Sequence, residues 1–294
     1  MVNPVTQVLL PAAVVVVMFA VGATLTLEDL RRVLRRPRAF LLGLVAHALL
    51  LPALAFGVAA GLGLPPAIAV GLVLIASCPA NASASILTHL ARGDTMLSVC
   101  LTAAASLTSV VTVPLFVNAA LSLSDPGGSA VRLPMLASSL GLFFVSTLPV
   151  LAGMRLRQVR PETARALEAR LSGVGLAVVV VVVMAAVWSE KANVLPALMS
   201  AGLPAVLTNA LSVAGAWGAS FLAGLPREQR IAVGLECGLQ NFALAAFVAL
   251  TLMRNSQILL PGIAYGLTMW LSAAVVVFVA RWDLGLIAPG ERPH

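Results

Sequence analysis

Seven uninterrupted apolar segments, each about as long as a bilayer is thick, constrain the fold of this chain most strongly. A membrane-spanning helix needs about 20 mostly apolar residues. The segments lie near Val5–Leu25, Ala39–Ala59, Thr95–Leu121, Leu133–Met154, Leu171–Trp188, Leu195–Ala223 and Gln257–Ala280. The composition agrees, because 60% of the residues are hydrophobic and only 10% are charged, whereas soluble domains are about 45–50% apolar. We therefore expect an all-α polytopic membrane protein.

Two further apolar tracts are long enough to cross a membrane but contain helix-breaking residues. Pro66–Arg92 is interrupted by Cys78-Pro79-Ala80-Asn81, and Gln229–Met253 is interrupted by Gly238-Leu239-Gln240-Asn241. Proline cannot donate a hydrogen bond to the helix, and glycine weakens a helix interior. The sequence thus predicts nine transmembrane helices, two of them discontinuous.

Basic residues occupy every second loop between these segments. The net charge of +7 could suggest nucleic acid, but the placement of the 18 Lys and Arg residues instead indicates orientation in a membrane. Cytoplasmic loops are the basic ones, and all but Arg132, Lys191 and Arg254 fall on one side. We expect a plasma (inner) membrane protein with its N-terminus outside, its first span retained and its C-terminus cytoplasmic, and we expect no nucleic-acid partner.

An internal repeat relates the two interrupted tracts. The pentapeptide Ile-Ala-Val-Gly-Leu occurs at Ile68–Leu72 and Ile231–Leu235, and Gly-Leu-Pro precedes each copy. By the charge pattern the two copies enter the membrane from opposite sides, which is typical of the inverted repeats of secondary transporters. We therefore expect one transporter domain over 1–294. It would contain a first repeat at 1–125 that lacks one helix, a second repeat at 130–283, and a cytoplasmic tail at 284–294.

Glu236 is the only acidic residue that cannot be assigned to a loop, and it lies just before the second interruption. An ionisable group inside a membrane usually marks a functional site. Gln240 and Asn241 follow within about one turn, and the break frees backbone carbonyls that must find partners. Together they form an oxygen-rich environment suited to a small hard cation.

Polar residues also surround the first interruption. They are Asn81, Ser83, Ser85 and Thr88, followed by Ser98 and Thr102, which lie four residues apart on one face of the next span. The Ser98 and Thr102 hydroxyls could complete the site of Glu236, or they could bond back to their own helix. Both interpretations stay open at this point.

Several tracts resemble the bile acid:sodium symporter family over nearly the whole chain. They are Met18–Asp29, Pro52, Cys78-Pro79, Leu87–Asp94, Leu97-Ser98 and Glu236–Asn241. The resemblance implies a core domain with two crossing broken helices and a panel domain that moves against it. Members that lack the first helix have nine spans and an outside N-terminus, as expected here.

The resemblance also implies a pair of sodium sites that share one acidic residue. Glu236, Gln240, Ser98 and Thr102 match the family's ion ligands, and Asn241 matches its neighbour at the substrate cavity. This chain departs from the family at Ala84-Ser85, where the family has Ser-Asn, and at His47, where it has Gln. We expect Na+ as the coupling ion, with Ser85 and His47 at the altered positions.

His47 leaves the coupling ion open. It is the only histidine deep inside an expected span. It could be a neutral ligand, a protonatable partner that supports proton coupling, or a core histidine bonded to a neighbouring hydroxyl.

The resemblance implies an organic anion as the transported molecule. The positive N-terminal ends of opposed half-helices give a physical reason for anion binding. Thr268-Met269-Trp270 replaces a polar His-Asn pair of the bile-acid-binding members, which favours a different or smaller carboxylate. The expected substrate-lining residues are Asn241, Asn81, Thr88, Thr208, Asn209 and Thr268.

Other functional classes are less consistent with the sequence. An intramembrane enzyme would need a nucleophile with a base or a metal cluster, but the chain has no His-Glu-x-x-His pattern and no second intramembrane acid. We expect no catalytic residues, no further cofactor and no obligatory protein partner apart from the lipid bilayer. A channel or a receptor of the same fold remains an alternative.

Overall fold

The computed structural model describes residues 4–26, 28, 31, 33, 37–124, 133–189 and 191–282. This part of the chain is helical apart from short connections and one isolated backbone bridge. The α-helices are α1 (Pro4–Gly22), α3 (Pro37–Val45), α4 (Leu51–Gly61), α5 (Pro66–Ser77), α6 (Ser83–Leu90), α7 (Thr95–Ser124), α8 (Met135–Leu142), α9 (Leu148–Val159), α10 (Pro161–Ser189), α11 (Lys191–Leu222), α12 (Arg227–Gly238), α13 (Phe242–Phe247) and α14 (Leu260–Trp282). The expected tail at 284–294 and the basic residues Arg32, Arg35, Arg36 and Arg132 lie outside the described residues.

Helices lie where the sequence predicts them. In the described part of the chain, five helices are long and apolar enough to cross a membrane: Pro37–Gly61, Thr95–Ser124, Met135–Val159, Met199–Leu222 and Gln257–Trp282. Shorter apolar helices cover Gln7–Gly22, Pro66–Ser77 and Phe242–Leu252. The expected segment Leu171–Trp188 lies within α10. The all-helical membrane class is therefore confirmed.

Two of the long helices contain a widened π-helical turn just before a proline. The turn at Ala46–Leu50 joins α3 to α4 and precedes Pro52, and the turn at Phe143–Thr147 joins α8 to α9 and precedes Pro149. A proline removes one donor and clashes with the carbonyl four residues earlier, so the helix widens locally rather than breaking. His47 lies in the first of these turns.

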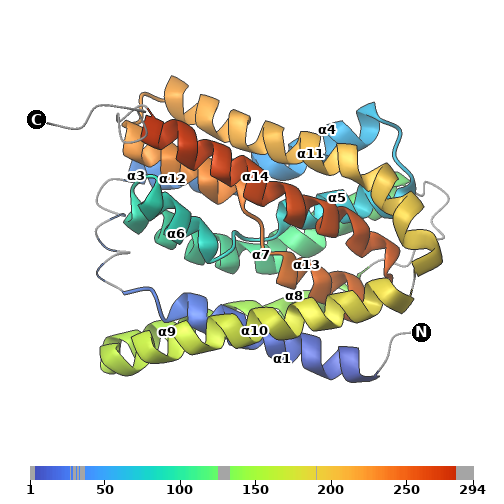
Figure 1. Ribbon diagram of the computed structural model, residues 1–294, viewed down its shortest axis with the longest axis horizontal. Coiled ribbons are helices and arrows are strands. Elements are labelled where there is room, and N and C mark those ends of the chain that lie inside the picture. Colours follow the sequence, from blue (N-terminus) through green and yellow to red (C-terminus); the bar gives the residue numbers. More distant parts are fainter. Residues whose placement is uncertain are drawn as a thin grey trace, which may run out of the picture.

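The helices form two groups (Figure 1). α1, α9 and α10 lie side by side along one side of the molecule, and α1 packs on both of the others. The second group contains α5, α7, α11, α12 and α14, which pack on one another, with α6 against α7 and α12. α13 contacts α1 and α10 of the first group and α5 and α14 of the second, so it joins the two groups.

The two Gly-Leu-Pro tracts adopt the same local structure. Gly63 follows α4 with φ +57° and Gly224 follows α11 with φ +67°. Only glycine adopts this left-handed conformation at little cost, and it is the common residue after a helix C-terminus. Pro65 and Pro226 then cap the N-termini of α5 and α12. The sequence repeat therefore corresponds to a repeated helix end and helix start.

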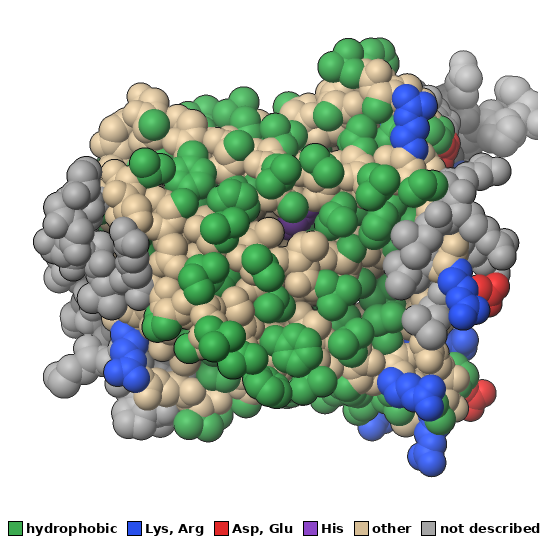
Figure 2. All heavy atoms as spheres, turned by 180° about the vertical axis from the view of Figure 1, so that it is seen from behind, with side chains coloured by type: hydrophobic (Ala, Val, Ile, Leu, Met, Phe, Trp, Pro, Cys, Tyr) green, Lys and Arg blue, Asp and Glu red, His purple; other side chains and the backbone are tan. Residues whose placement is uncertain are grey.

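The outer surface has the polarity of a membrane protein. Apolar side chains cover the middle of the face in Figure 2, whereas Lys and Arg side chains lie near its two ends. Many large apolar residues are exposed, including Leu136 (76%), Met199 (76%) and Leu222 (87%). An apolar surface of this extent is suited to lipid contact.

Candidate functional site

The two interrupted helices meet at their breaks. α5 ends at Ser77, and Cys78 is extended, as expected for a residue that precedes a proline. α12 ends at Gly238, and Leu239 is extended. The two extended segments run antiparallel, with Ala80 opposite Gln240.

A reciprocal pair of backbone hydrogen bonds joins the two breaks. The Asn81 N–H donates to the Leu239 carbonyl at 2.9 Å, and the Asn241 N–H donates to the Pro79 carbonyl at 2.8 Å. Groups that leave a helix inside a membrane need partners within the protein. Each break therefore supplies partners for the other.

A side chain from a preceding helix bonds to one further carbonyl at each break. His47 Nε2 lies 2.8 Å from the Cys78 carbonyl oxygen, and Asn209 Nδ2 donates to the Gly238 carbonyl at 2.8 Å. A carbonyl oxygen only accepts, so Nε2 of His47 carries the hydrogen. His47 and Asn209 thus play matching roles at the two breaks.

Glu236 is completely buried near the end of α12. Ser98 Oγ donates to its Oε2 at 2.9 Å, and Thr102 Oγ1 donates to its Oε1 at 2.6 Å. Thr102 Oγ1 also lies 3.2 Å from the Ser98 carbonyl oxygen, the alternative acceptor within its own helix. The structure therefore brings together three of the six residues expected at the ion site.

The other three expected ion-site residues have different surroundings. Gln240 is fully buried, its Nε2 donates to the Cys237 carbonyl at 3.0 Å, and its Oε1 has no hydrogen-bond partner. Ser85 is partly buried and donates to the Ala82 carbonyl at 2.9 Å. His47 bonds to the Cys78 carbonyl as described above, and its Nδ1 has no partner.

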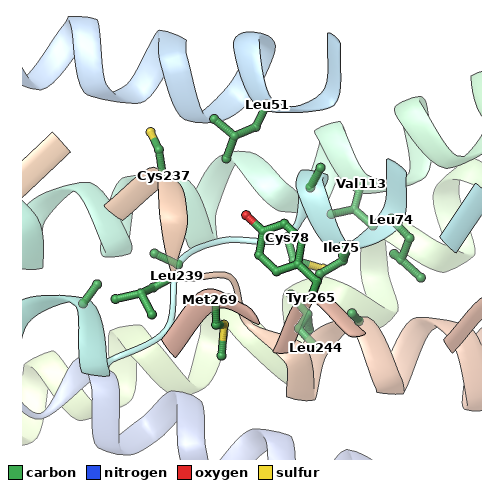
Figure 3. Close-up of a cluster of buried hydrophobic side chains, with 14 of the residues drawn as sticks. Leu51, Leu74, Ile75, Cys78, Val113, Cys237, Leu239, Leu244, Tyr265 and Met269 are labelled. Atoms are coloured by element: carbon green, nitrogen blue, oxygen red, sulfur yellow. The ribbon is translucent and has the colours of Figure 1, made fainter. Parts of the chain in front are cut away.

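The donor set suits a hard cation. A carboxylate has about four lone-pair positions, and the two hydroxyls occupy one on each oxygen of Glu236. Hydroxyl and amide oxygens are neutral ligands of the kind that a hard cation accepts, and Oε1 of Gln240 has no hydrogen-bond partner. Buried side chains that include Cys78, Leu239, Tyr265 and Met269 lie around the crossing (Figure 3).

A cavity of about 380 Å³ opens next to the crossing. Asn81, Ser83 and Ser85 line it from the first break, and Asn241 lines it from the second. Trp270 of α14 and Glu168 of α10 also face it. This volume is within the range of small-molecule sites, about 300–1,000 Å³.

Both asparagines at the breaks have a fixed amide orientation. Asn81 Oδ1 accepts from the Ser83 N–H at 3.3 Å, and Asn241 Oδ1 accepts from the Leu244 N–H at 3.0 Å. The Asn241 oxygen caps α13, and the Asn81 oxygen accepts from the first residue of α6, so both NH₂ groups are left for other partners. Nδ2 of Asn241 has only a long contact, 3.9 Å from Sδ of Met18.

The remaining residues expected at the substrate site are not among those lining the cavity. Thr88 is buried near the far end of α6. Each helical residue advances about 1.5 Å, so Thr88 lies well away from the break. Thr208 and Asn209 are buried on α11. Thr268 bonds to the Tyr265 carbonyl at 3.1 Å, whereas its neighbours Met269 and Trp270 line the cavity.

Sequence reasoning missed Glu168, Trp270 and Tyr265. Glu168 lies in a basic stretch that reads as a cytoplasmic loop but belongs to α10. The hydroxyl of the fully buried Tyr265 lies close to the polar side chains of Asn209, Ser212 and Gln240. As the only tyrosine in the chain, located inside an apolar segment, it was a signal that could have been followed.

The sequence matches a known protein family over most of its length. Residues 11–197 match the Sodium Bile acid symporter family. The chain belongs to this family. The matched residues include Asn81, Ser98 and Thr102 and end before α12.

Similar proteins come from bacteria, plants and mammals. The chain is 30% identical over 240 residues to the uncharacterized sodium-dependent transporter YocS of Bacillus subtilis, with 80% of this chain and 71% of that protein covered. It is 29% identical over 234 residues to the probable chloroplastic sodium/metabolite cotransporter BASS1 of Arabidopsis thaliana, covering 80% of this chain and 57% of the relative. It is 26% identical over 239 residues to the ileal sodium/bile acid cotransporter of Cricetulus griseus, covering 79% and 66%. The chain thus spans little more than half the length of the Arabidopsis relative.

Proposed function

We propose that this protein is a secondary active symporter that moves an organic anion across a membrane together with sodium. One observation carries the proposal. The short segment from Glu236 to Asn241 supplies both the buried carboxylate bonded to Ser98 and Thr102 and an amide that lines the cavity. An ion and an organic molecule could therefore bind to the same break.

Sodium is the coupling ion that the chemistry favours. The buried carboxylate of Glu236, the two hydroxyls and the free Oε1 of Gln240 are oxygen ligands that suit a hard cation. The names of YocS, BASS1 and the ileal cotransporter all refer to sodium. Sodium binding would neutralise a buried charge that is otherwise expensive in a membrane.

The substrate that the cavity favours carries a carboxylate. Asn81 and Asn241 line it, and the bonds that their amide oxygens accept leave the NH₂ groups as donors. Donors of this kind match an ionised carboxylate, which can only accept hydrogen bonds. The surrounding wall includes Ile86, Phe242 and Ile263, so the rest of the substrate would be mainly apolar.

The proposed architecture has nine crossings of the plasma (inner) membrane, with the N-terminus outside and the C-terminus cytoplasmic. Inverted repeats at 1–125 and 130–283 would place α5/α6 and α12/α13 in opposite orientations. The matching glycine turns, the proline-linked π turns and the reciprocal bonds at the breaks support this arrangement. We further propose that the α1, α9 and α10 group moves against the rest to alternate access.

Sodium binding tests the proposal without a known substrate. Thermal unfolding of the purified protein is compared in NaCl and KCl at equal ionic strength. We expect sodium to raise the unfolding temperature of the unmodified protein, since a ligand that binds only the folded state stabilises it.

Two variants of α12 locate the effect. Glu236→Gln keeps the side-chain shape and one of the two acceptor oxygens but loses the charge, so it should lose the sodium response. Glu228→Gln alters an exposed glutamate of the same helix and should keep it. Equal unfolding temperatures of the unmodified protein in the two salts would refute sodium binding.

Uptake into proteoliposomes then tests transport. A sodium gradient at equal pH should drive accumulation of labelled carboxylates by the unmodified protein and by Glu228→Gln, but not by Glu236→Gln. Passive ion conduction without sodium-driven accumulation across a panel of organic acids would contradict a symporter.

A further inference from the structure

The charge of the cavity carries information about the transported molecule. Glu168 is the only ionisable side chain among the described residues that line the cavity. It is half-buried on α10. The amide donors of Asn81 and Asn241 suit the carboxylate of a substrate, and Glu168 adds a negative charge to the described wall of the same cavity.

The carboxylate and the amide donors come from different parts of the molecule. Asn81 and Asn241 belong to the crossing of α5/α6 and α12/α13, whereas Glu168 belongs to the group formed by α1, α9 and α10 (Figure 1). A molecule that fills the cavity therefore meets neutral N–H donors from one group of helices and a negative charge from the other.

This arrangement discriminates between substrates by charge. Most of the cavity wall is apolar, including Val17, Val179, Ile263 and Leu267. Charges interact more strongly beside such walls than in bulk water. A second negative charge on the substrate would be repelled by Glu168, and a cationic or strongly donating group would be attracted. Specificity commonly depends on such a repulsive element.

We propose that Glu168 is a specificity-determining residue that selects a zwitterionic substrate, a carboxylate that also carries an ammonium or similar cationic group, over a dicarboxylate. This inference rests on the proposed function, because it takes the cavity as the transport site. Asn81 and Asn241 bind the carboxylate, and Glu168 faces the cationic group.

Matched probes test the selection. They are unbranched compounds of four, six and eight carbons, each as the monocarboxylate, the dicarboxylate and the ω-amino acid. Binding is measured as stabilisation against thermal unfolding in saturating sodium. At one or more lengths, the unmodified protein should bind the ω-amino acid most tightly and the dicarboxylate most weakly, with about a tenfold difference between them.

Substitution of Glu168 should remove this order. Glu168→Gln should bring the three affinities at that length within about threefold of one another, and Glu168→Lys should favour the dicarboxylate. Glu162→Gln is the matched control, because Glu162 is exposed on the same helix and does not line the cavity. It should behave as the unmodified protein does.

The outcomes separate this inference from the proposed function. A dicarboxylate preference in the unmodified protein, or an unchanged order in Glu168→Gln, would overturn the role of Glu168. Stabilisation by sodium but by none of the ω-amino acids would overturn the zwitterionic substrate and leave the sodium site standing. If sodium did not stabilise the unmodified protein, the proposed function itself would be overturned.

Discussion

Thr102 donates its hydroxyl to Oε1 of Glu236 at 2.6 Å, across 134 positions of sequence. The bond links α7 to the end of α12 directly beside the helix break. A buried carboxylate that accepts a hydrogen bond at this distance is restrained in position. The lone pairs of Glu236 that the hydroxyls do not use therefore keep a fixed direction.

Removing this hydroxyl should weaken sodium binding. Thr102→Val keeps the side-chain shape but loses the oxygen, and hydrogen bonds to charged groups contribute about 1.5–3 kcal/mol. We expect the apparent sodium affinity to fall by about tenfold or more, measured by titration of the unfolding temperature. Thr102→Ser should retain most of it. Thr112→Val is the control, because Thr112 bonds only within α7, to the Thr108 carbonyl. Equal affinities in Thr102→Val and Thr112→Val would exclude Thr102 as a ligand.

Replacing an amide donor at the cavity with an acceptor should block anion binding. Asn241→Asp keeps the oxygen that caps Leu244, and Asp caps helices about as well as Asn. It replaces the NH₂ donor with an acceptor, so carboxylate uptake should fall more than tenfold while sodium still stabilises the protein. Uptake by Asn241→Asp at the unmodified rate would contradict carboxylate binding at this residue. Asn81→Asp should act in the same way through its bond to Ser83.

His47 should matter through its bond to the Cys78 carbonyl. His47→Leu leaves that buried carbonyl without its side-chain donor, which we expect to cost about 1–3 kcal/mol of stability. His47→Gln retains an N–H donor and should be closer to the unmodified protein. Chemical denaturation in detergent measures the difference. If His47→Leu were as stable as His47→Gln, the bond would have no structural role.

Close packing of α1 against α9 should be sensitive to a single methyl group. A Cβ at Gly153 would collide with the Phe19 carbonyl oxygen, and one at Gly22 would collide with the Val150 carbonyl. Gly153→Ala should therefore destabilise the protein by about 1–3 kcal/mol. A Cβ at Gly218 would meet no atom within 4 Å, so Gly218→Ala should be neutral or stabilising by up to about 1 kcal/mol. Thermal unfolding of the two variants side by side tests this, and equal midpoints would argue against the close approach.

Local chemistry made the helices and their interruptions predictable from sequence. Apolar length indicated the helices, and Pro79 and Gly238 indicated the breaks. The spacing of Ser98 and Thr102 predicted a shared face, but the choice between Glu236 and their own helix as acceptor depended on the packing of α7 against α12.

Other features depend on contacts that no local pattern encodes. The pairing of Ala80 with Gln240 requires the relative placement of two helices far apart in sequence. The exposure of Glu168 to the cavity depends on how α10 packs, and its sequence neighbours Arg165 and Arg170 suggested only a loop. Ser85 was expected beside the ion, but it lines the cavity. Its helix, α6, begins after the first break and leads away from that break.

The paired backbone bonds of Asn81 and Asn241 have a consequence for local stability. Neither break can unwind further without breaking a bond that the other break needs. Local openings occur in cooperative units whose free energies depend on such shared bonds. The centre of the molecule should therefore open as one unit, and the amide hydrogens of Asn81 and Asn241 should exchange with solvent deuterium at similar, slow rates although they lie 160 residues apart.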